Sequence, residues 1–305
     1  MSDRSAIEWT DATWNPVTGC TEVSPGCDHC YAKVFAERWR GTPDHYYTNG
    51  FDVMLRPDKL DQPVRWAKPR RVFVNSMADL FHADVPDDYI AQVFGVMAKT
   101  PQHTFQVLTK RHARMRHLLA SIEFQALVYK HSGSMTWPLP NVWVGVSAED
   151  QQWADIRIAA LFDTPAAVRW ISVEPMLGQI KLPFCKIDPK TYAVTGLDWV
   201  VAGGESGRGA RPMHPVWVQS LRDQCDQMNV PFLFKQWGAW APARGAGQPT
   251  DRLVFQDGRS IRLGHANRRT LQRWDFVVMR AGTKSDNGRV LDGVTHDAYP
   301  TGVSA

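Results

Sequence analysis

The stretch VWVGVSAED, residues 142–150, begins with an apolar run and ends with a serine and a carboxylate. Its apolar part does not alternate with polar residues, which is typical of a strand that is covered on both faces. Five other runs have the same character: VFVNS (72–76), FQVLT (105–109), VRWISV (168–173), DWVVAGG (198–204) and FLFKQ (232–236). Segments with helical spacing separate them, and this alternation predicts parallel β/α architecture. We expect an α/β fold, a full or partial parallel β/α (TIM-like) barrel, with a doubly wound open sheet as the alternative.

The helical segments between these runs are amphipathic. YAKVFAERW (31–39) places Tyr31, Val34, Phe35 and Trp39 on one stripe, a pattern typical of a helix that packs against a core. Cys225 lies on a similar stripe, so we expect it to be a core residue. We also expect a structural role for Cys185.

Each apolar run is followed at once by charged or hydrogen-bonding residues. In β/α barrels, the carboxyl ends of the strands form the rim where active sites are built. Polar residues also follow strands simply because strands reach the surface, and any one cation can be a solvated rim charge. Six successive cases favour a functional rim, with Lys110, Lys235 and Glu205 as its candidate catalytic residues. The other rim candidates are Ser76, Asp79, Arg111, Ser147, Glu149 and Glu174.

Charge and composition limit the class of protein. The chain has 305 residues and a net charge of +4. No run approaches the roughly eighteen apolar residues that cross a bilayer, and MSDRSAIEWTDATW (1–14) lacks the apolar core of an export signal. The chain has five cysteines, an odd number, and three of them are crowded together, which is not a disulfide framework. We expect a cytoplasmic protein with no membrane partner, in a reducing compartment where clustered cysteines bind metal or act chemically.

The positive charge gathers at the C-terminal end. Residues 239–305 hold ten Lys/Arg and six Asp/Glu, whereas residues 1–238 hold 25 of each sign. We expect a barrel over residues 1–238 and a basic C-terminal extension over 239–305, with a hairpin around Asp257-Gly258. Clustered arginines beside aromatic residues suit a nucleic-acid backbone, although a solvated basic face has the same composition. These arginines are Arg259, Arg262, Arg268, Arg269 and Arg273.

The segment TGCTEVSPGCDHCYAK (18–33) holds Cys20, Cys27 and Cys30 in one polar loop. Three thiolates can ligate an iron–sulfur cluster and leave one iron free. Alternatively, they bind zinc together with His29 or His45, or they are free and structural. The residue types and spacing leave these three interpretations open.

A three-cysteine loop before β/α repeats with polar strand ends resembles the radical S-adenosylmethionine (SAM) enzymes. The spacing here is C-x6-C-x2-C, whereas C-x3-C-x2-C is common in that superfamily. The resemblance implies a [4Fe–4S] cluster on Cys20, Cys27 and Cys30 and SAM as second cofactor. Reductive cleavage of SAM then yields a 5′-deoxyadenosyl radical. The aromatic position beside the adenine corresponds to His29, with Tyr31 directly after it.

Seven motifs also resemble a phage-associated family of uncharacterised proteins with a three-cysteine motif, commonly regarded as radical-SAM-like. Two groups of roles follow from the position of the motifs at successive strand ends. Ser76 and Asp79 would hold the methionine amino group, and Ser147 and Glu149 the ribose, with Glu174 as a second candidate. Gly203 and Gly204 would let the backbone approach a ligand closely. The motifs are WNPVTGCTEVSPGCDHCYA, VFVNSMADLFH, LTKR, WVGVSAED, ISVEPMLG, GGESG…ARPM and PFLFKQWG.

The resemblance and the basic extension together favour a radical SAM enzyme that acts on a nucleic-acid base. The reaction would be lesion repair, as spore photoproduct lyase performs, or modification of thymidine-type bases in phage or bacterial DNA. A radical SAM enzyme for a small metabolite or peptide is one alternative, and a zinc-stabilised, non-enzymatic nucleic-acid-binding protein is another. An electron donor such as flavodoxin or ferredoxin is implied as a partner.

Overall fold

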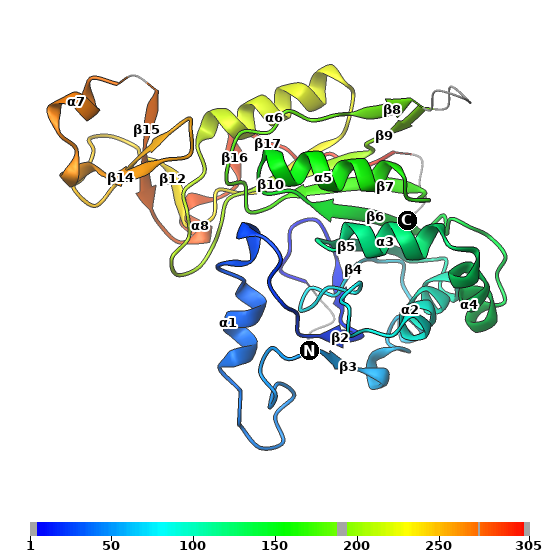
Figure 1. Ribbon diagram of the computed structural model, residues 1–305. Coiled ribbons are helices and arrows are strands. Elements are labelled where there is room, and N and C mark those ends of the chain that lie inside the picture. The colour runs from blue at the N-terminus through cyan, green and yellow to red at the C-terminus, as the bar shows by residue number, and fades with distance from the viewer. Residues whose placement is uncertain (1–4, 188–193, 274, 302–305) are drawn as a thin grey trace.

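The computed structural model describes residues 5–187, 194–273 and 275–301. Its centre is a sheet of seven parallel strands in the order β1-β4-β5-β6-β7-β10-β11 (Figure 1). The strands are β1 (Ala12–Trp14), β4 (Arg71–Val74), β5 (Thr104–Thr109), β6 (Val142–Ser147), β7 (Val168–Val173), β10 (Trp199–Gly203) and β11 (Phe232–Gln236). Strand order follows chain order without a reversal, which excludes the doubly wound alternative. The expected parallel β/α barrel is confirmed in its partial form, a curled sheet that is open between its edge strands β1 and β11.

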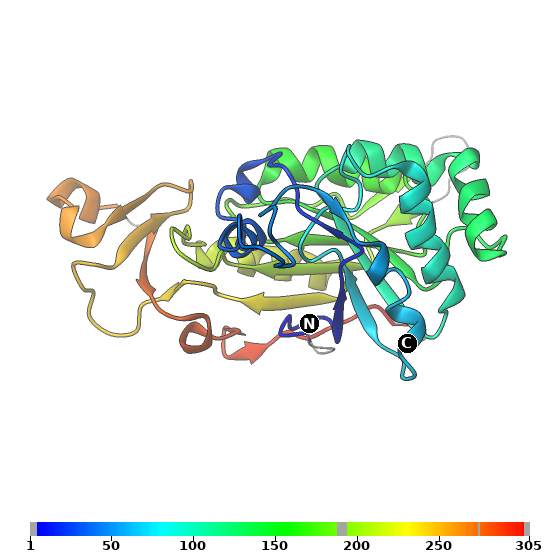
Figure 2. The same ribbon diagram turned by 90° about the horizontal axis from the view of Figure 1, so that it is seen from below.

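The crossover helices cover the outer face of this sheet (Figure 2). Every second residue of the strands points toward these helices and packs against them in the larger core cluster. This cluster contains Val72, Val144, Ile171, Val200 and Phe234. Burial on both faces explains why the strands lack polar alternation. The helices are α2 (Asp87–Lys99), α3 (His112–Ala120), α4 (Ile122–Ser132), α5 (Gln151–Phe162) and α6 (Pro215–Gln227), and α1 (Tyr31–Glu37) follows the cysteine loop.

Residues of the opposite parity form a second core on the concave face. Trp9 makes edge contacts there with Phe73, Trp170 and Trp199, whose ring centroids lie 4.6, 5.3 and 6.2 Å away. A Cβ on Gly145 would lie 2.6 Å from the Trp170 ring, so glycine is required for this packing. Four of the thirteen tryptophans, Trp9, Trp143, Trp170 and Trp199, therefore fill the inside of the half-barrel.

A second, antiparallel sheet lies at one end of the molecule (Figure 1). It has the order β12-β15-β13-β14, and the turn between β13 and β14 contains Asp257 and Gly258. The predicted boundary at residue 238 falls just before β12. Later residues return to the main sheet. Asp297 forms an isolated β-bridge with Leu233, and the Tyr299 ring stacks on Trp199. The elements are β12 (Trp240–Pro242), β13 (Arg252–Phe255), β14 (Ser260–Arg262), α7 (Arg268–Leu271), β15 (Phe276–Ala281), α8 (Lys284–Asn287), β16 (Val290–Leu291) and β17 (Val294–Thr295).

Two short strand pairs and four 3-10 helices complete the described structure. They are β2 (Val17–Thr18) with β3 (Met54–Leu55), β8 (Cys185–Ile187) with β9 (Val194–Gly196), and the 3-10 turns Pro25–Cys27, Pro57–Lys59, Pro63–Arg65 and Leu263–His265. None of the helices in the described ranges has the length and apolar character needed to span a membrane.

Candidate active site

A cavity of about 480 Å³ opens at the carboxyl ends of the strands. The three cysteines of the loop all line it, although seven chain positions separate the first from the second. Polar groups from β6, β7, β11 and the segments after β4, β5 and β7 line it too. These groups are Ser76, Asp79, Lys110, Ser147, Ser172, Glu174 and Lys235. The fold thus brings most of the predicted rim residues to the same cavity as the thiols.

Three arginines fasten the cysteine loop, residues 19–30, to the strand ends. Arg211 donates to Asp28 at 2.9 Å and to the Pro25 carbonyl at 2.8 Å. Arg111 donates to the Thr21 hydroxyl at 2.7 Å. Arg157 acts indirectly, because it pairs at 2.9 Å with the Glu149 carboxylate, which accepts the Gly26 N–H at 3.3 Å. The position of the thiols therefore depends on contacts with three different strand ends.

The electrostatics around Cys20 combine opposing influences. Burial and the nearby Asp79 carboxylate raise the pKa of Cys20 to about 11, while Arg111 acts in the lowering direction. The Arg111 guanidinium Nη2 lies 4.0 Å from the Cys20 sulfur. All three loop cysteines are free thiols and are partly exposed to the cavity. A thiolate bound to a metal cluster would be stabilised by the same arginine.

Cys20, Cys27 and Cys30 are the residues that would hold a [4Fe–4S] cluster, because all three line this cavity. In the described ranges, no three His, Cys, Asp or Glu side chains are grouped so that they could hold one metal ion. A single zinc ion needs its ligands around one point, whereas a cluster bonds each thiolate to a different iron. His29 lines a neighbouring cavity, and His45 stacks on Trp39 with ring centroids 4.1 Å apart. Neither histidine of the zinc hypothesis lines the cavity of the thiols.

The polar groups of the rim are already organised by hydrogen bonds. Asp79 accepts from the Thr109 hydroxyl at 2.7 and 2.9 Å and from the Lys110 N–H at 3.0 Å. Lys235 pairs with Glu174 at 3.0 Å. The Ser172 hydroxyl donates to the same carboxylate at 3.1 Å. These bonds restrict each side chain to one orientation toward the cavity.

Lys110 differs from Lys235 in having no carboxylate partner in the part of the chain that the structure describes. Its ammonium donates to the Ser147 hydroxyl at 3.3 Å. Ser147 and Ser172 are register partners on adjacent strands β6 and β7. The cavity thus contains a cation and two neighbouring hydroxyls that can bind an anionic, hydroxyl-bearing ligand.

Other predicted site residues lie outside this cavity. Glu149 is completely buried against Arg157. Glu205 is paired at 2.6 Å with Arg211, the residue that contacts the cysteine loop. A Cβ on Gly204 would lie 2.0 Å from the Trp237 carbonyl, so the close approach there is to this chain's own backbone. A Cβ on Gly203 would meet Glu174 at 2.9 Å. The ligand or catalytic roles predicted for these four residues stay predictions.

Sequence reasoning missed the residues that position the loop, chiefly Arg157 and Arg211. Arg157 lies in QQWADIRIAAL, where a wholly buried arginine interrupts the apolar side of α5. A charged residue among apolar helix positions is a signal for a buried ion pair. Ser172 was also missed because it occupies an apolar strand, VRWISV. The role of Arg211 at the loop could not be read locally, because its partners there, Asp28 and Pro25, lie more than 180 positions away in the chain.

The fold and the cavity define a class of protein, an open parallel β/α barrel with a three-cysteine loop at the carboxyl ends of its strands. Within that class, the chain belongs to the family described as protein of unknown function (DUF5131), which it matches over residues 4–300. Among curated proteins no sequence matches significantly.

Solved structures of spore photoproduct lyase are similar to this chain at low sequence identity. One contains dinucleoside spore photoproduct and has 10% identity and a TM-score of 0.43, over 93% of this chain and 72% of the other. A variant of that lyase with bound AdoMet and dinucleoside spore photoproduct has 11% identity and a TM-score of 0.40, over 89% and 68%. At this level of similarity, function has to be inferred from the residues of this chain.

Proposed function

We propose that this protein is a radical SAM enzyme that holds a [4Fe–4S] cluster on Cys20, Cys27 and Cys30. The supporting observation is that the three thiols and the polar strand ends line the same cavity. When bound, the cluster would supply the electron that cleaves SAM reductively to a 5′-deoxyadenosyl radical and methionine. A cytoplasmic setting and an electron donor such as flavodoxin or ferredoxin belong to the same proposal.

The strand ends offer separate places for the two polar parts of SAM. Lys110, which has no carboxylate partner in the described ranges, would bind the methionine carboxylate. Glu174 would accept the ribose hydroxyls, because it reaches the cavity while the first candidate, Glu149, is buried in an ion pair. Lys235 pairs with Glu174 at 3.0 Å and holds its carboxylate in place. Asp79 and Ser76 would accept the methionine amino group at the end of β4.

We further propose a nucleic-acid base as the substrate, in repair or modification of thymidine-type bases. Reaction at a base requires an unstacked or flipped nucleotide. The C-terminal arginines support a contact with the phosphate backbone. Two of them are engaged in ion pairs, Arg259 with Asp257 and Arg273 with Asp275, while Arg268 and Arg269 on α7 are exposed.

Anaerobic reconstitution tests the proposed cluster. We expect a brown protein with roughly four irons and four sulfides per chain, which forms 5′-deoxyadenosine when given SAM and reductant. Cys27→Ala should lose both the cluster and this product. Cys185→Ala is the matched control, because Cys185 is an exposed thiol outside the loop and its removal should change neither.

Two results would overturn the proposal. One is a full cluster in Cys27→Ala, which would show that other ligands hold it. The other is a colourless wild-type protein that carries one zinc and is unchanged by iron and sulfide, which would favour the non-enzymatic zinc protein.

A further inference from the structure

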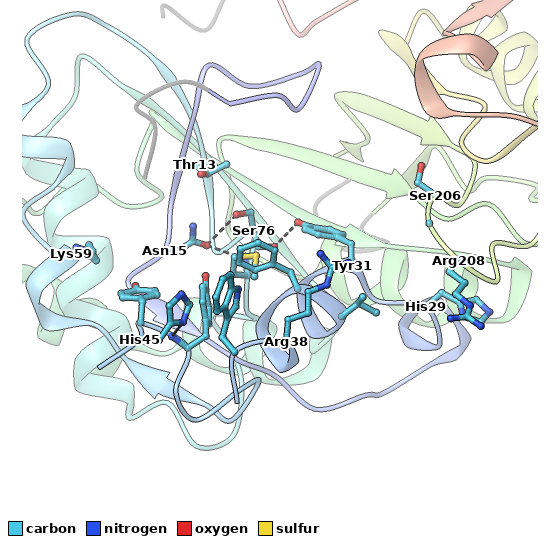
Figure 3. Close-up of a pocket in the computed structure, with 17 residues that line it drawn as sticks. Thr13, Asn15, His29, Tyr31, Arg38, His45, Lys59, Ser76, Ser206 and Arg208 are labelled. Atoms are coloured by element: carbon cyan, nitrogen blue, oxygen red, sulfur yellow. Dashed lines mark hydrogen bonds between the residues drawn. The ribbon is translucent and has the colours of Figure 1, made fainter. Parts of the chain in front are cut away.

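A second cavity of about 880 Å³ is lined by the residues drawn in Figure 3 and shares part of its wall with the cavity of the thiols. It extends between α1, the segment after it and residues 206–208. Thr13, Tyr31 and Ser76 line both cavities. The Tyr31 hydroxyl donates to the Ser76 carbonyl at 2.5 Å, so this pair forms part of the boundary between the two. A ligand in the second cavity would therefore lie next to the proposed site of radical formation.

The wall of this cavity is unusually aromatic and exposed. The apolar stripe of α1 was expected to face a core, but the helix buries Ala32 and Ala36 instead. Tyr31, Phe35 and Trp39 remain 59%, 44% and 38% exposed and line the cavity. A solvent-exposed aromatic stripe costs free energy and is typical of a binding surface. Aromatic rings are sequence-tolerant stacking platforms for nucleic-acid bases.

The charged side chains that line this cavity are all positive, and one of them, Lys59, is paired with Asp58 at 2.8 Å. Arg38, Lys59 and Arg208 line the cavity, and no Asp or Glu is among the described residues that do so. Arg38 and Arg208 are exposed and have no ion-pair partner in the described ranges. Arg38 lies beside Tyr31 and Arg208 beside His29 (Figure 3). Guanidinium groups without carboxylate partners are suited to bind phosphate oxygens.

We propose that the second cavity binds a nucleotide unit of a single-stranded nucleic acid. The base would stack on the aromatic wall formed by Tyr31, Phe35 and Trp39, and the flanking phosphates would lie against Arg38 and Arg208. The identification of this nucleotide as the substrate rests on the radical SAM function proposed above. Its binding does not, because the cavity and its charges exist independently of the cluster.

Binding of a fluorescently labelled DNA single strand to the full-length reconstituted protein tests the site. With an oligonucleotide of about eight nucleotides, we expect Trp39→Ala to weaken binding roughly tenfold through loss of stacking. Arg38→Gln should weaken binding and also flatten its decrease between about 50 and 200 mM salt, because fewer counterions are released. Thymidine monophosphate serves as the second probe. Competition by it would show that one nucleotide suffices, and its failure to compete would show that the site reads a strand.

Matched variants outside the cavity separate the site from general charge and apolar effects. Tyr129→Ala removes a comparably exposed aromatic residue on α4, and Arg65→Gln removes another exposed cation. Both should bind like the wild type. Arg268→Gln/Arg269→Gln tests the extension, whose helix α7 lies away from α1 in both views (Figures 1 and 2). Wild-type binding by the Trp39 and Arg38 variants, or loss of binding only in the α7 variant, would overturn the inference.

The two proposals fail in different ways. A protein that binds the strand through Trp39 and Arg38 but forms no 5′-deoxyadenosine retains the nucleotide site and refutes the radical chemistry. A protein that forms 5′-deoxyadenosine but binds no strand retains the chemistry and refutes this site. Thermal unfolding of each variant checks that the exposed substitutions leave the fold intact.

Discussion

At the scale of single residues, the most demanding feature is the buried pair of Arg157 and Glu149. Both side chains have no solvent exposure, and Glu149 also accepts the Gly26 N–H of the cysteine loop. Burial lowers the pKa of Arg157, and the Glu149 carboxylate opposes that shift. A buried ion pair contributes little net stability, but removing one member leaves an uncompensated charge. The pair therefore connects α5 to the loop, and removing either member should strongly destabilise the fold.

We expect Arg157→Met to lower the free energy of unfolding by about 3–5 kcal/mol, because Glu149 would remain buried without its partner. Urea denaturation followed by circular dichroism measures the change. Lys33→Ala is the control, since it breaks the exposed pair of Lys33 and Glu22 and should cost less than about 1 kcal/mol. Similar losses in the two variants would contradict the assigned role of the buried pair.

At the scale of elements, the cysteine loop is ordered by neighbours that are remote in the chain. It has one 3-10 turn of its own, Pro25–Cys27, and its first residues donate backbone bonds to remote segments, from Gly19 to the Met77 carbonyl and from Cys20 to the Phe51 carbonyl. Further contacts come from side chains at the ends of β5, β6 and β10. Arg211 is central among them because it joins Asp28 and Pro25 to Glu205. Local opening of the loop should therefore depend on this arginine.

Arg211→Met removes four side-chain hydrogen bonds, to Asp28, Pro25 and Glu205, and should raise amide hydrogen exchange in residues 19–30 by at least about tenfold. Exchange in α2 should not change, because that helix packs into the larger core cluster away from the loop. The chain is labelled with deuterium and then digested, and mass spectrometry of the resulting peptides measures exchange in both segments. Arg222→Met is the matched control, since its partners Asp223 and Asp292 lie outside the loop. Unchanged exchange in the loop would refute the role of Arg211.

At the scale of the whole molecule, burial affects the protonation of several histidines, and the carboxylates near His82 and His214 oppose this effect without reversing it. Burial lowers the pKa of His82, His103, His112 and His214 below the ordinary value of 6.5. They are distributed over separate parts of the barrel. His214 accepts the Val216 N–H at the start of α6, and His103 is completely buried. Acid should therefore act on the fold as a whole.

The free energy of unfolding should decrease as pH falls below 6.5. The unfolded chain then binds protons that the folded histidines resist, so stability that is complete above this pH is lost below it. Urea titrations at a series of pH values measure the effect. His103→Gln should reduce the slope in this window, because one depressed group is removed. A stability that stays constant or rises from pH 6.5 downward would contradict the prediction.

The sequence alone determined the class of fold and part of the composition of the candidate site. Uninterrupted apolar runs such as VWVGV indicate strands that are buried on both faces. Polar residues follow each run, at the carboxyl end of the strand where barrel active sites are built. This local physics was sufficient to predict the parallel barrel, the rim and the three-cysteine loop. It was also sufficient to predict Asp79, Lys110, Ser147, Glu174 and Lys235 as rim residues.

Only the tertiary structure decided which of these residues share a cavity. Glu149 and Glu174 look alike as carboxylates after strands, but Arg157 buries one while the other reaches the cavity. Likewise, the stripe of α1 has the spacing of a core-facing helix, yet the fold exposes it. The physical reason is that burial and pairing depend on groups far apart in the chain, and neither spacing nor residue type records which of them meet.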